Sequence, residues 1–202
     1  MSGRGSHYFA DRPSAPSEQR PVRIALDDVE LELTSDTGVF SAGRLDPGTR
    51  VLLERAPDPP AGEVLDLGCG YGPIACTLAL REPAARVWAV DVNERALSLV
   101  EGNAQRLGAA GVLARRPEDV PEDLRFDAIY SNPPIRSGKA DLHAMLQQWL
   151  PRLTGSGAAH LVVARHLGAD SLAKWLTESG FPCEKLRSNR GYRLLEVTRG
   201  LE

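Results

Sequence analysis

Cysteine is scarce in this 202-residue sequence, which contains three cysteines, Cys69, Cys76 and Cys183. An odd number without paired spacing argues against a disulfide framework and favours reduced thiols, as in the cytoplasm. No group of cysteine and histidine residues has the spacing of metal ligands, so we expect no bound metal. Cys69 lies within a glycine-rich stretch, and we interpret it as a small residue that fits a tight turn.

Long apolar runs are also missing. No stretch of about 18 apolar residues is present, and no basic segment followed by an apolar one opens the chain, which excludes a transmembrane helix and a secretory signal. We therefore expect no membrane partner and a cytoplasmic location. The formal net charge is only −3, which argues against nucleic-acid binding over the whole surface and leaves local binding open.

An alternation of strand and helix patterns does run through the sequence from residue 63 onward. The expected strands are 63–67, 86–91, 111–114, 126–131, 158–164, 183–187 and 192–197. The expected helices are 47–54, 72–81, 93–107, 139–153 and 171–176, the last with its end at Gly180. Right-handed crossovers between parallel strands would give a doubly wound α/β sheet, which the last two strands close as an antiparallel hairpin.

The chain before residue 61 has a different character. Residues 1–20 are rich in Ser, Pro, Arg and Gly, which predicts a mobile tail, although we expect the aromatic pair in His7–Phe9 to dock on the body. Period-two alternation between residues 22 and 33 predicts a β-hairpin, and Asp46 is expected to cap the helix that follows it. The expected organisation is a tail (1–20), a hairpin-and-helix extension (21–56) and one compact body (61–202).

A glycine turn follows the first strand of the body. Glycines at a strand-to-helix turn let a ligand approach the bare backbone. A dinucleotide fingerprint would need glycine where Pro73 stands, and a carboxylate at Asp66 would repel a pyrophosphate. An anion here suits a cationic ligand, such as the ammonium and sulfonium of S-adenosylmethionine. The candidate cofactor-binding residues of this turn are Asp66, Gly68, Cys69, Gly70 and Gly72.

A second acid, Asp91, stands at the tip of the next expected strand, beside Val92. A carboxylate at this place can accept two hydrogen bonds from a ribose diol. Asp91 or Asn93 could instead cap the helix that follows, and both roles are compatible. We therefore add Asp91 and Val92 to the candidate cofactor site.

The stretch Asn132-Pro133-Pro134-Ile135 follows the strand at 126–131, at the edge where open α/β sheets bind ligands. Two prolines hold the backbone extended and donate no hydrogen bonds, which leaves the Asn132 side-chain carbonyl and the Pro133 backbone carbonyl as acceptors facing the pocket. Two acceptors on an exocyclic amine would localise its lone pair for attack on a methyl group. Asn132, Pro133, Pro134 and Ile135 are the catalytic candidates, with Asn132 also close to the cofactor and Ile135 able to cover a base.

Together these motifs resemble the class I S-adenosylmethionine-dependent methyltransferases. The N-P-P stretch looks like the motif of amino-group methyltransferases, and the segments 7–9, 36–41 and 45–49 look like the "methyltransferase small domain" family, which includes small-subunit ribosomal RNA guanine-N2 methyltransferases. The resemblance runs from about His7 to about Arg199. It implies a mostly parallel, seven-stranded Rossmann-like sheet with S-adenosylmethionine as cofactor.

The resemblance also implies the leading function, N-methylation of the exocyclic N2 amine of a guanine in ribosomal RNA or in the small ribosomal subunit. A protein glutamine-N5 or adenine-N6 methyltransferase would share the same motif logic. A cofactor-binding assembly protein without catalysis remains a third reading. Candidate substrate-binding residues are Phe40, Arg136, Lys139 and Arg193.

Overall fold

The computed structural model describes residues 15–135 and 138–200, so His7–Phe9 and Arg136 lie outside the described residues. The strands are β1 (Arg20–Ala25), β2 (Glu30–Ser35), β3 (Glu63–Leu67), β4 (Arg86–Val90), β5 (Val112–Arg115), β6 (Phe126–Ser131), β7 (Leu153–Ala164), β8 (Cys183–Asn189) and β9 (Tyr192–Thr198). The α-helices are α1 (Pro47–Arg55), α2 (Pro73–Arg81), α3 (Glu94–Leu107), α4 (Lys139–Trp149) and α5 (Ala169–Glu178). Short 3-10 helices are η1 (Pro117–Asp119), η3 (Leu150–Arg152) and η4 (Arg165–Leu167).

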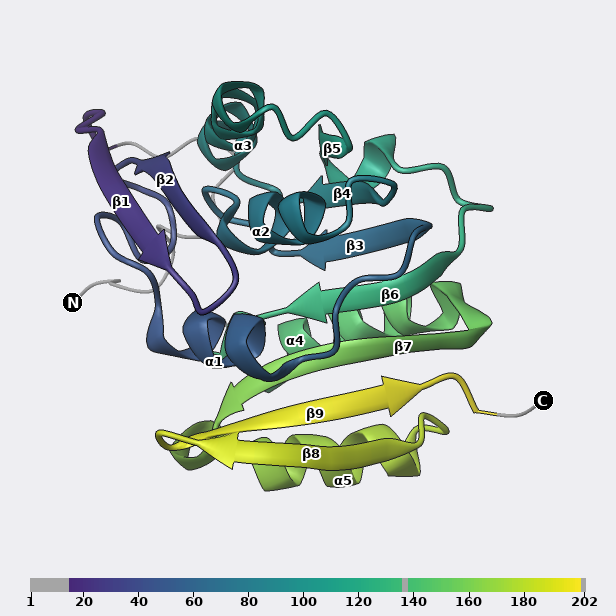
Figure 1. Ribbon diagram of the computed structural model, residues 1–202. Helices are drawn as coiled ribbons and strands as arrows, with labels where there is room; N and C mark the ends of the chain where they lie inside the picture. Colours follow the sequence, from purple (N-terminus) through teal and green to yellow (C-terminus); the bar gives the residue numbers. More distant parts are fainter. Residues whose placement is uncertain (1–14, 136–137, 201–202) are drawn as a thin grey trace.

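Seven strands form one sheet in the order β5-β4-β3-β6-β7-β9-β8 (Figure 1). The pairs among β3, β4, β5, β6 and β7 are parallel, whereas β9 runs antiparallel to both β7 and β8. The order reverses at β3, so the carboxyl ends of β3, β4 and β6 meet at one edge, where open α/β sheets bind their ligands. The predicted doubly wound, mostly parallel, seven-stranded sheet is confirmed.

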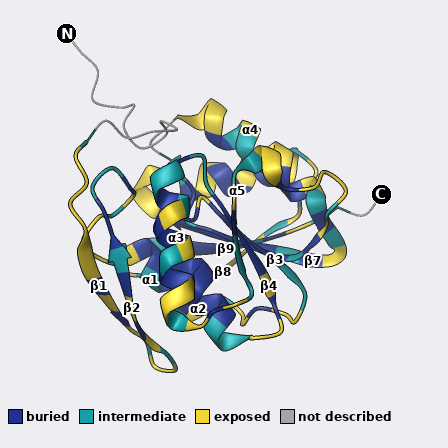
Figure 2. Cartoon of the chain, turned by 90° about the horizontal axis from the view of Figure 1, so that it is seen from above, coloured by how far each residue is buried: buried dark blue, intermediate teal, exposed yellow. Residues whose placement is uncertain are grey.

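Two apolar clusters cover the two faces of this sheet (Figure 2). Helices α1, α2 and α3 supply one cluster, and α4 and α5 supply the other. Side chains of β3 alternate between them: Val64 belongs to the first cluster, while Leu65 and Leu67 belong to the second. The near-continuous apolar strands of the sequence follow from this arrangement, because a parallel sheet is buried on both faces.

The hairpin β1–β2 packs on the α1–α3 side and shares its core. Val22 pairs with Leu33 and Ile24 with Leu31, and all four side chains are buried. Asn103 of α3, which is fully buried, joins the hairpin to the body. Its Oδ1 accepts a hydrogen bond from Thr34 N at 2.8 Å, and its Nδ2 donates to Thr34 O and Tyr71 O at 2.9 and 2.8 Å.

The predicted tail ends earlier than residue 20. The hydroxyl of Ser17 and the backbone N–H of Glu18 donate to the buried carboxylate of Asp36 at 2.5 and 2.6 Å, and Arg20 already begins β1. The local sequence around Ser17 and Glu18 does not indicate this contact, because Asp36 lies 19 and 18 positions further along the chain.

Strand β7 is longer than the predicted 158–164, since it begins at Leu153. The prediction missed residues 153–157 because Gly155 and Gly157 lie there, and glycine weakens the sequence pattern of a strand. Gly157 is required by close packing: a Cβ there would lie 2.8 Å from the backbone oxygen of Phe126 on β6. In the described ranges, no helix combines the length and apolarity needed to cross a membrane.

Candidate active site

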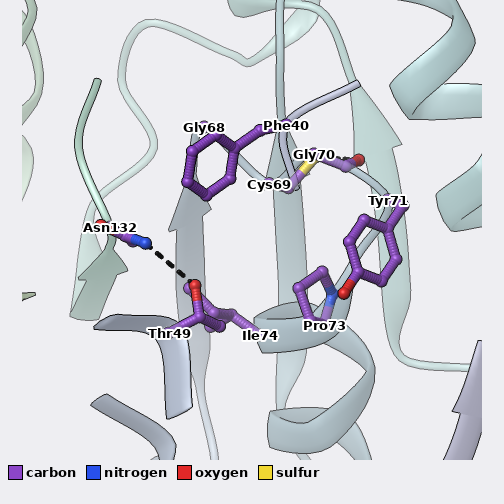
Figure 3. A pocket seen from close by; sticks show the side chains of 9 residues that line it. All are labelled: Phe40, Thr49, Gly68, Cys69, Gly70, Tyr71, Pro73, Ile74 and Asn132. Carbon is purple, nitrogen blue, oxygen red and sulfur yellow. Dashed lines mark hydrogen bonds between the residues drawn. The ribbon is translucent and has the colours of Figure 1, made fainter. Parts of the chain in front are cut away.

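A pocket opens at the carboxyl ends of β3 and β6 (Figure 3). Its wall combines the glycine turn, the start of α2, the residue after β6, and two residues of the segment between β2 and β3. The lining residues are Phe40, Thr49, Gly68, Cys69, Gly70, Tyr71, Pro73, Ile74 and Asn132. The structure therefore brings together the glycine turn and the N-P-P motif, which are far apart in the sequence.

The three glycines of the turn have positive φ, at 77° for Gly68, 54° for Gly70 and 92° for Gly72. An added Cβ at Gly68 would meet no atom within 4 Å, and at Gly70 only the Cβ of Phe40 at 4.0 Å. At Gly72 it would lie 3.1 Å from a methyl carbon of Val100 on α3. The first two glycines leave the backbone bare for a ligand, whereas the third allows helix packing.

Asp66 lies beneath the turn, which corrects the expectation that its charge points into the ligand space. The side chain is 0% exposed, and its Oδ2 accepts a hydrogen bond from Ala75 N in the first turn of α2 at 2.9 Å. Its Oδ1 has no hydrogen-bond partner among the residues that the structure describes. Burial, with a smaller effect of the neighbouring Asp91 charge, raises the pKa of Asp66 to about 8, against the hydrogen bond from Ala75. The carboxyl group is therefore a helix-capping group, protonated at neutral pH.

Asp91 holds the turn from the other side. Its Oδ2 accepts a hydrogen bond from Gly70 N and its Oδ1 one from Asn93 N, both at 2.9 Å. Burial raises the pKa of Asp91, and these backbone N–H groups oppose the rise. The cap of α3 is Asn93, whose Oδ1 accepts from Arg95 N and Ala96 N. Asp91 therefore fixes the glycine turn and leaves the capping role to its neighbour.

Cys69 and Val92 complete the predicted cofactor set. Cys69 lines the pocket, and burial raises the pKa of its thiol well above the usual range, which disfavours the reactive thiolate. Val92 is half-buried directly after Asp91 and outside the pocket wall. Among the described residues, no group of histidine, cysteine and acidic side chains could hold a metal ion.

Asn132 reaches across to the start of α1. Its Nδ2 donates to Asp46 Oδ1 at 2.8 Å. The same nitrogen donates to Thr49 Oγ1 at 3.0 Å, as Figure 3 shows. Both partners were missed as site residues. The sequence signal predicts Asp46 as a helix cap, which the structure confirms, but nothing in the sequence indicates that the same side chain holds Asn132.

The rest of the N-P-P motif differs from the expectation. The Pro133 carbonyl oxygen accepts a hydrogen bond from Ile135 N at 2.9 Å, so it is engaged within the motif itself. The Ile135 side chain packs against the α4–α5 cluster and does not line the pocket. The turn that the Pro133 carbonyl closes directs Ile135 toward the core, and a contact of Ile135 with a base stays a prediction.

Two of the described candidates for substrate binding, Phe40 and Lys139, lie at the same edge, and Lys139 forms no ion pair with the residues that the structure describes. Phe40 is 49% exposed at the pocket wall, and Lys139 is exposed at the first residue of α4. Arg193, near the start of β9, forms an ion pair with Asp170 of α5 at 3.2 Å. Its role in substrate binding stays a prediction.

The site has the properties that S-adenosylmethionine requires: a glycine turn whose bare backbone faces the pocket, an acid that braces this turn, and an exposed aromatic side chain at the pocket wall. A doubly wound sheet with this turn and an N-P-P motif after β6 defines the chain as an S-adenosylmethionine-dependent methyltransferase. Residues 30–196 match the sequence model of the Methyltransferase small domain family, and the chain belongs to that family.

Two relatives within this family are similar in sequence to this chain. The chain is 33% identical over 195 residues to the uncharacterized protein YbxB of Bacillus subtilis, covering 95% of this chain and 97% of that one. It is 34% identical over 155 residues to ribosomal RNA small subunit methyltransferase C of Psychromonas ingrahamii, covering 74% of this chain and 44% of the relative. The chain thus spans about half the length of the curated relatives that carry this name.

A solved structure is also similar to this chain. The Thermus thermophilus 16S rRNA N2 G1207 methyltransferase, in complex with AdoMet and guanosine, superposes with a TM-score of 0.73 and 27% identity. The match covers 93% of this chain and 52% of that protein.

Proposed function

We propose that this methyltransferase acts on the exocyclic N2 amine of a guanine in ribosomal RNA, either free or within the small ribosomal subunit. The proposal includes the cytoplasm as the place of reaction. The observation that carries it is the Asn132 side chain, whose amide nitrogen is held by α1 at the pocket wall. The names of the ribosomal RNA methyltransferases to which the chain is similar support the substrate.

An acceptor suits this chemistry because the nitrogen of an exocyclic amine is a poor nucleophile. Its lone pair is delocalised into the base, and a hydrogen bond from the amine to a fixed oxygen favours a tetrahedral nitrogen with a localised pair. The cofactor supplies an electrophilic methyl group on a sulfonium. Asn132 would bind and orient the amine, with an interaction that strengthens as the nitrogen becomes tetrahedral.

The cofactor would lie along Gly68 and Gly70, which offer bare backbone to the pocket. Asp91 would accept hydrogen bonds from the hydroxyl groups of the ribose. Each of its oxygens accepts one backbone N–H and keeps a further lone pair for this contact. Asp66 would act through α2 and the turn, since it is buried. Phe40 supports a planar substrate, because an exposed aromatic ring at a pocket wall can stack on a base.

The cations around this edge support an RNA substrate. Arg44, Lys139, Arg165, Arg187 and Arg190 are exposed, and within the described ranges their side chains form no ion pair. They come from the loop before α1, the start of α4, η4, the second half of β8 and the turn between β8 and β9. The N–H of Arg165 donates to Gly191 O at 2.9 Å, which ties η4 to this turn. Phosphate groups next to a target nucleotide would bind such side chains.

The test is methyl transfer from labelled S-adenosylmethionine to ribosomal RNA, to isolated small subunits and to ribosomal protein, with the product nucleoside identified by mass spectrometry. Asn132→Ala should lose at least about two orders of magnitude in turnover, because it removes a transition-state contact. Cofactor affinity, measured by calorimetry, should stay close to that of the wild type.

Other products would decide against the proposal. Methylated glutamine or N6-methyladenine would support the alternative substrates that share the N-P-P logic. Cofactor binding without transfer to any of the three substrates would support a non-catalytic assembly role. Wild-type turnover by Asn132→Ala would exclude the mechanism, whatever the substrate.

A further inference from the structure

We infer that Asp46 and Thr49, at the start of α1, are positioning residues that fix which atom of the Asn132 amide faces the substrate. The inference deepens the proposed function and rests on it. It assigns to the segment before the body a direct part in the site, because α1 lies within the predicted extension 21–56.

An amide group can turn over and exchange its oxygen and nitrogen, and only its partners decide the orientation. The partner of Asn132 at 2.8 Å is a carboxylate oxygen of Asp46, and a carboxylate only accepts hydrogen bonds. The nitrogen must therefore face α1. The second amide hydrogen has its own acceptor, Thr49 Oγ1, at 3.0 Å.

Both amide hydrogens are thus used inside the protein. The remaining polar atom, Asn132 Oδ1, receives no hydrogen bond from the described residues, while the neighbouring carbonyl of Pro133 is engaged by Ile135 N. The amide oxygen is therefore the acceptor that the motif leaves for an amine substrate. A reversed amide would present two donors to the amine and oppose its binding.

The acceptor on α1 is itself rigid. The same Oδ1 of Asp46 accepts hydrogen bonds from Gly48 N at 2.8 Å and Thr49 N at 3.0 Å, which cap the helix. Thr49 is 3% exposed, and the ring of Tyr192 packs against Gly48, since an added Cβ there would lie 2.8 Å from Tyr192 Cε1. Capping and packing hold the oxygen in place, and it in turn holds Asn132.

A merely structural cap would explain the contacts with Gly48 and Thr49 without any effect on Asn132, so the variants separate the two roles. Asp46→Asn keeps the capping oxygen in the same place and also keeps an acceptor for Asn132. Asp46→Ser also caps a helix well, but its hydroxyl is one bond shorter and can donate. Thr49→Val removes the second acceptor at equal size, and Thr49→Ser retains it.

Steady-state turnover on the RNA substrate, cofactor affinity and thermal stability are measured for each variant. We expect Asp46→Ser with Thr49→Val to lower kcat at least about tenfold, since a misplaced reacting group is costly, while the cofactor Kd changes less than about twofold. The matched pair Asp46→Asn with Thr49→Ser should retain most of the turnover. The Asn132 side-chain NH2 signals, assigned from their loss in Asn132→Ala, should exchange faster only in the first pair.

Three results would overturn the inference: wild-type kcat in Asp46→Ser with Thr49→Val, equal losses in both pairs, or unchanged exchange of the Asn132 amide hydrogens in the first pair. Failure of the proposed function gives a different pattern: the wild type itself would then not methylate guanine N2 in ribosomal RNA, or Asn132→Ala would remain active. A loss of folding in Asp46→Ser would appear in the melting temperature, and Thr49→Val alone then carries the comparison.

Discussion

A buried acid at residue 66 shows how burial changes the meaning of a motif. The sequence pattern places a carboxylate in a ligand-binding turn, whereas the folded chain buries it against the start of α2. Gly72, the residue before this helix, has no side chain to cap it, so the Asp66 oxygen supplies the acceptor for Ala75 N. The residue supports the cofactor site from below and does not contact the ligand space.

The pH dependence of stability tests this assignment. The pKa of Asp66 is about 8 in the folded protein, against a usual value of 3.8, so between these limits the folded state holds a proton that the unfolded chain has lost. The free energy of unfolding should therefore fall as pH rises through this window, by up to about 1.4 kcal/mol per pH unit. Asp66→Asn cannot ionise and should not show this contribution.

Urea unfolding of the wild type and of Asp66→Asn at several pH values from about 5 to about 8 gives the comparison. The stability difference between the two proteins should shift steadily in favour of the variant as pH rises. A difference that is independent of pH would mean that Asp66 is ionised in the folded protein, and the assignment would then be wrong.

At the scale of an element, the β3–α2 turn uses chemically identical glycines for different purposes. All three have positive φ, which strains any residue with a Cβ. They differ in what surrounds them: open pocket at Gly68, and the side chain of Val100 on α3 at Gly72. The same substitution should therefore have a different main effect at each position.

Gly68→Ala should weaken cofactor binding, because the new methyl group stands in the pocket, and should lower stability by about 1–2 kcal/mol from backbone strain alone. Gly72→Ala pays the same strain and must also displace Val100, so its loss of stability should be the larger. Calorimetry with the cofactor and denaturant unfolding measure both. Equal stability losses would show that α3 adjusts freely, and unchanged affinity in Gly68→Ala would remove the cofactor from this part of the turn.

At the scale of the whole molecule, charge is distributed unevenly. The chain has a formal net charge of −3, yet exposed cations that form no ion pair with any described residue gather along the edge that carries the pocket. Lys185 and Arg193 nearby are balanced by Asp170, so they contribute less to this field. An acidic protein with such an edge would direct an RNA to one side only.

Arg165→Gln with Arg190→Gln should therefore weaken RNA binding and reduce the slope of log K against log salt by about 1 to 2, as the loss of phosphate contacts does. Arg55→Gln is the matched control, since Arg55 is an equally exposed arginine at the far end of α1, without an ion pair in the described ranges. Fluorescence titration over a range of salt concentrations measures both. Similar slopes in the double variant and in the wild type would remove η4 and the β8–β9 turn from the RNA contact.

The sequence by itself determined most of the elements and the doubly wound class of the sheet. Apolar runs, the turn glycines and the Asp46 cap are local signals, and local signals survive folding because they act within a few residues. The alternation of strands and helices between residues 63 and 131 therefore agrees with the prediction. The N-P-P motif lies at the predicted edge of the sheet. Glycine-rich β7 was the exception, because close packing against β6 overrode its weak strand pattern.

Only the tertiary structure decided where each side chain of the site points and which partners it has. Asp66 turned from a ligand contact into a buried cap, Ile135 turned to the core, and Asn103 joined the hairpin to the glycine turn. The Asp46–Asn132 contact joins residues 86 positions apart, and no local pattern reports such a pair. The physical reason is that a side chain's charge, orientation and partners depend on burial and on distant neighbours, which the chain acquires only when it folds.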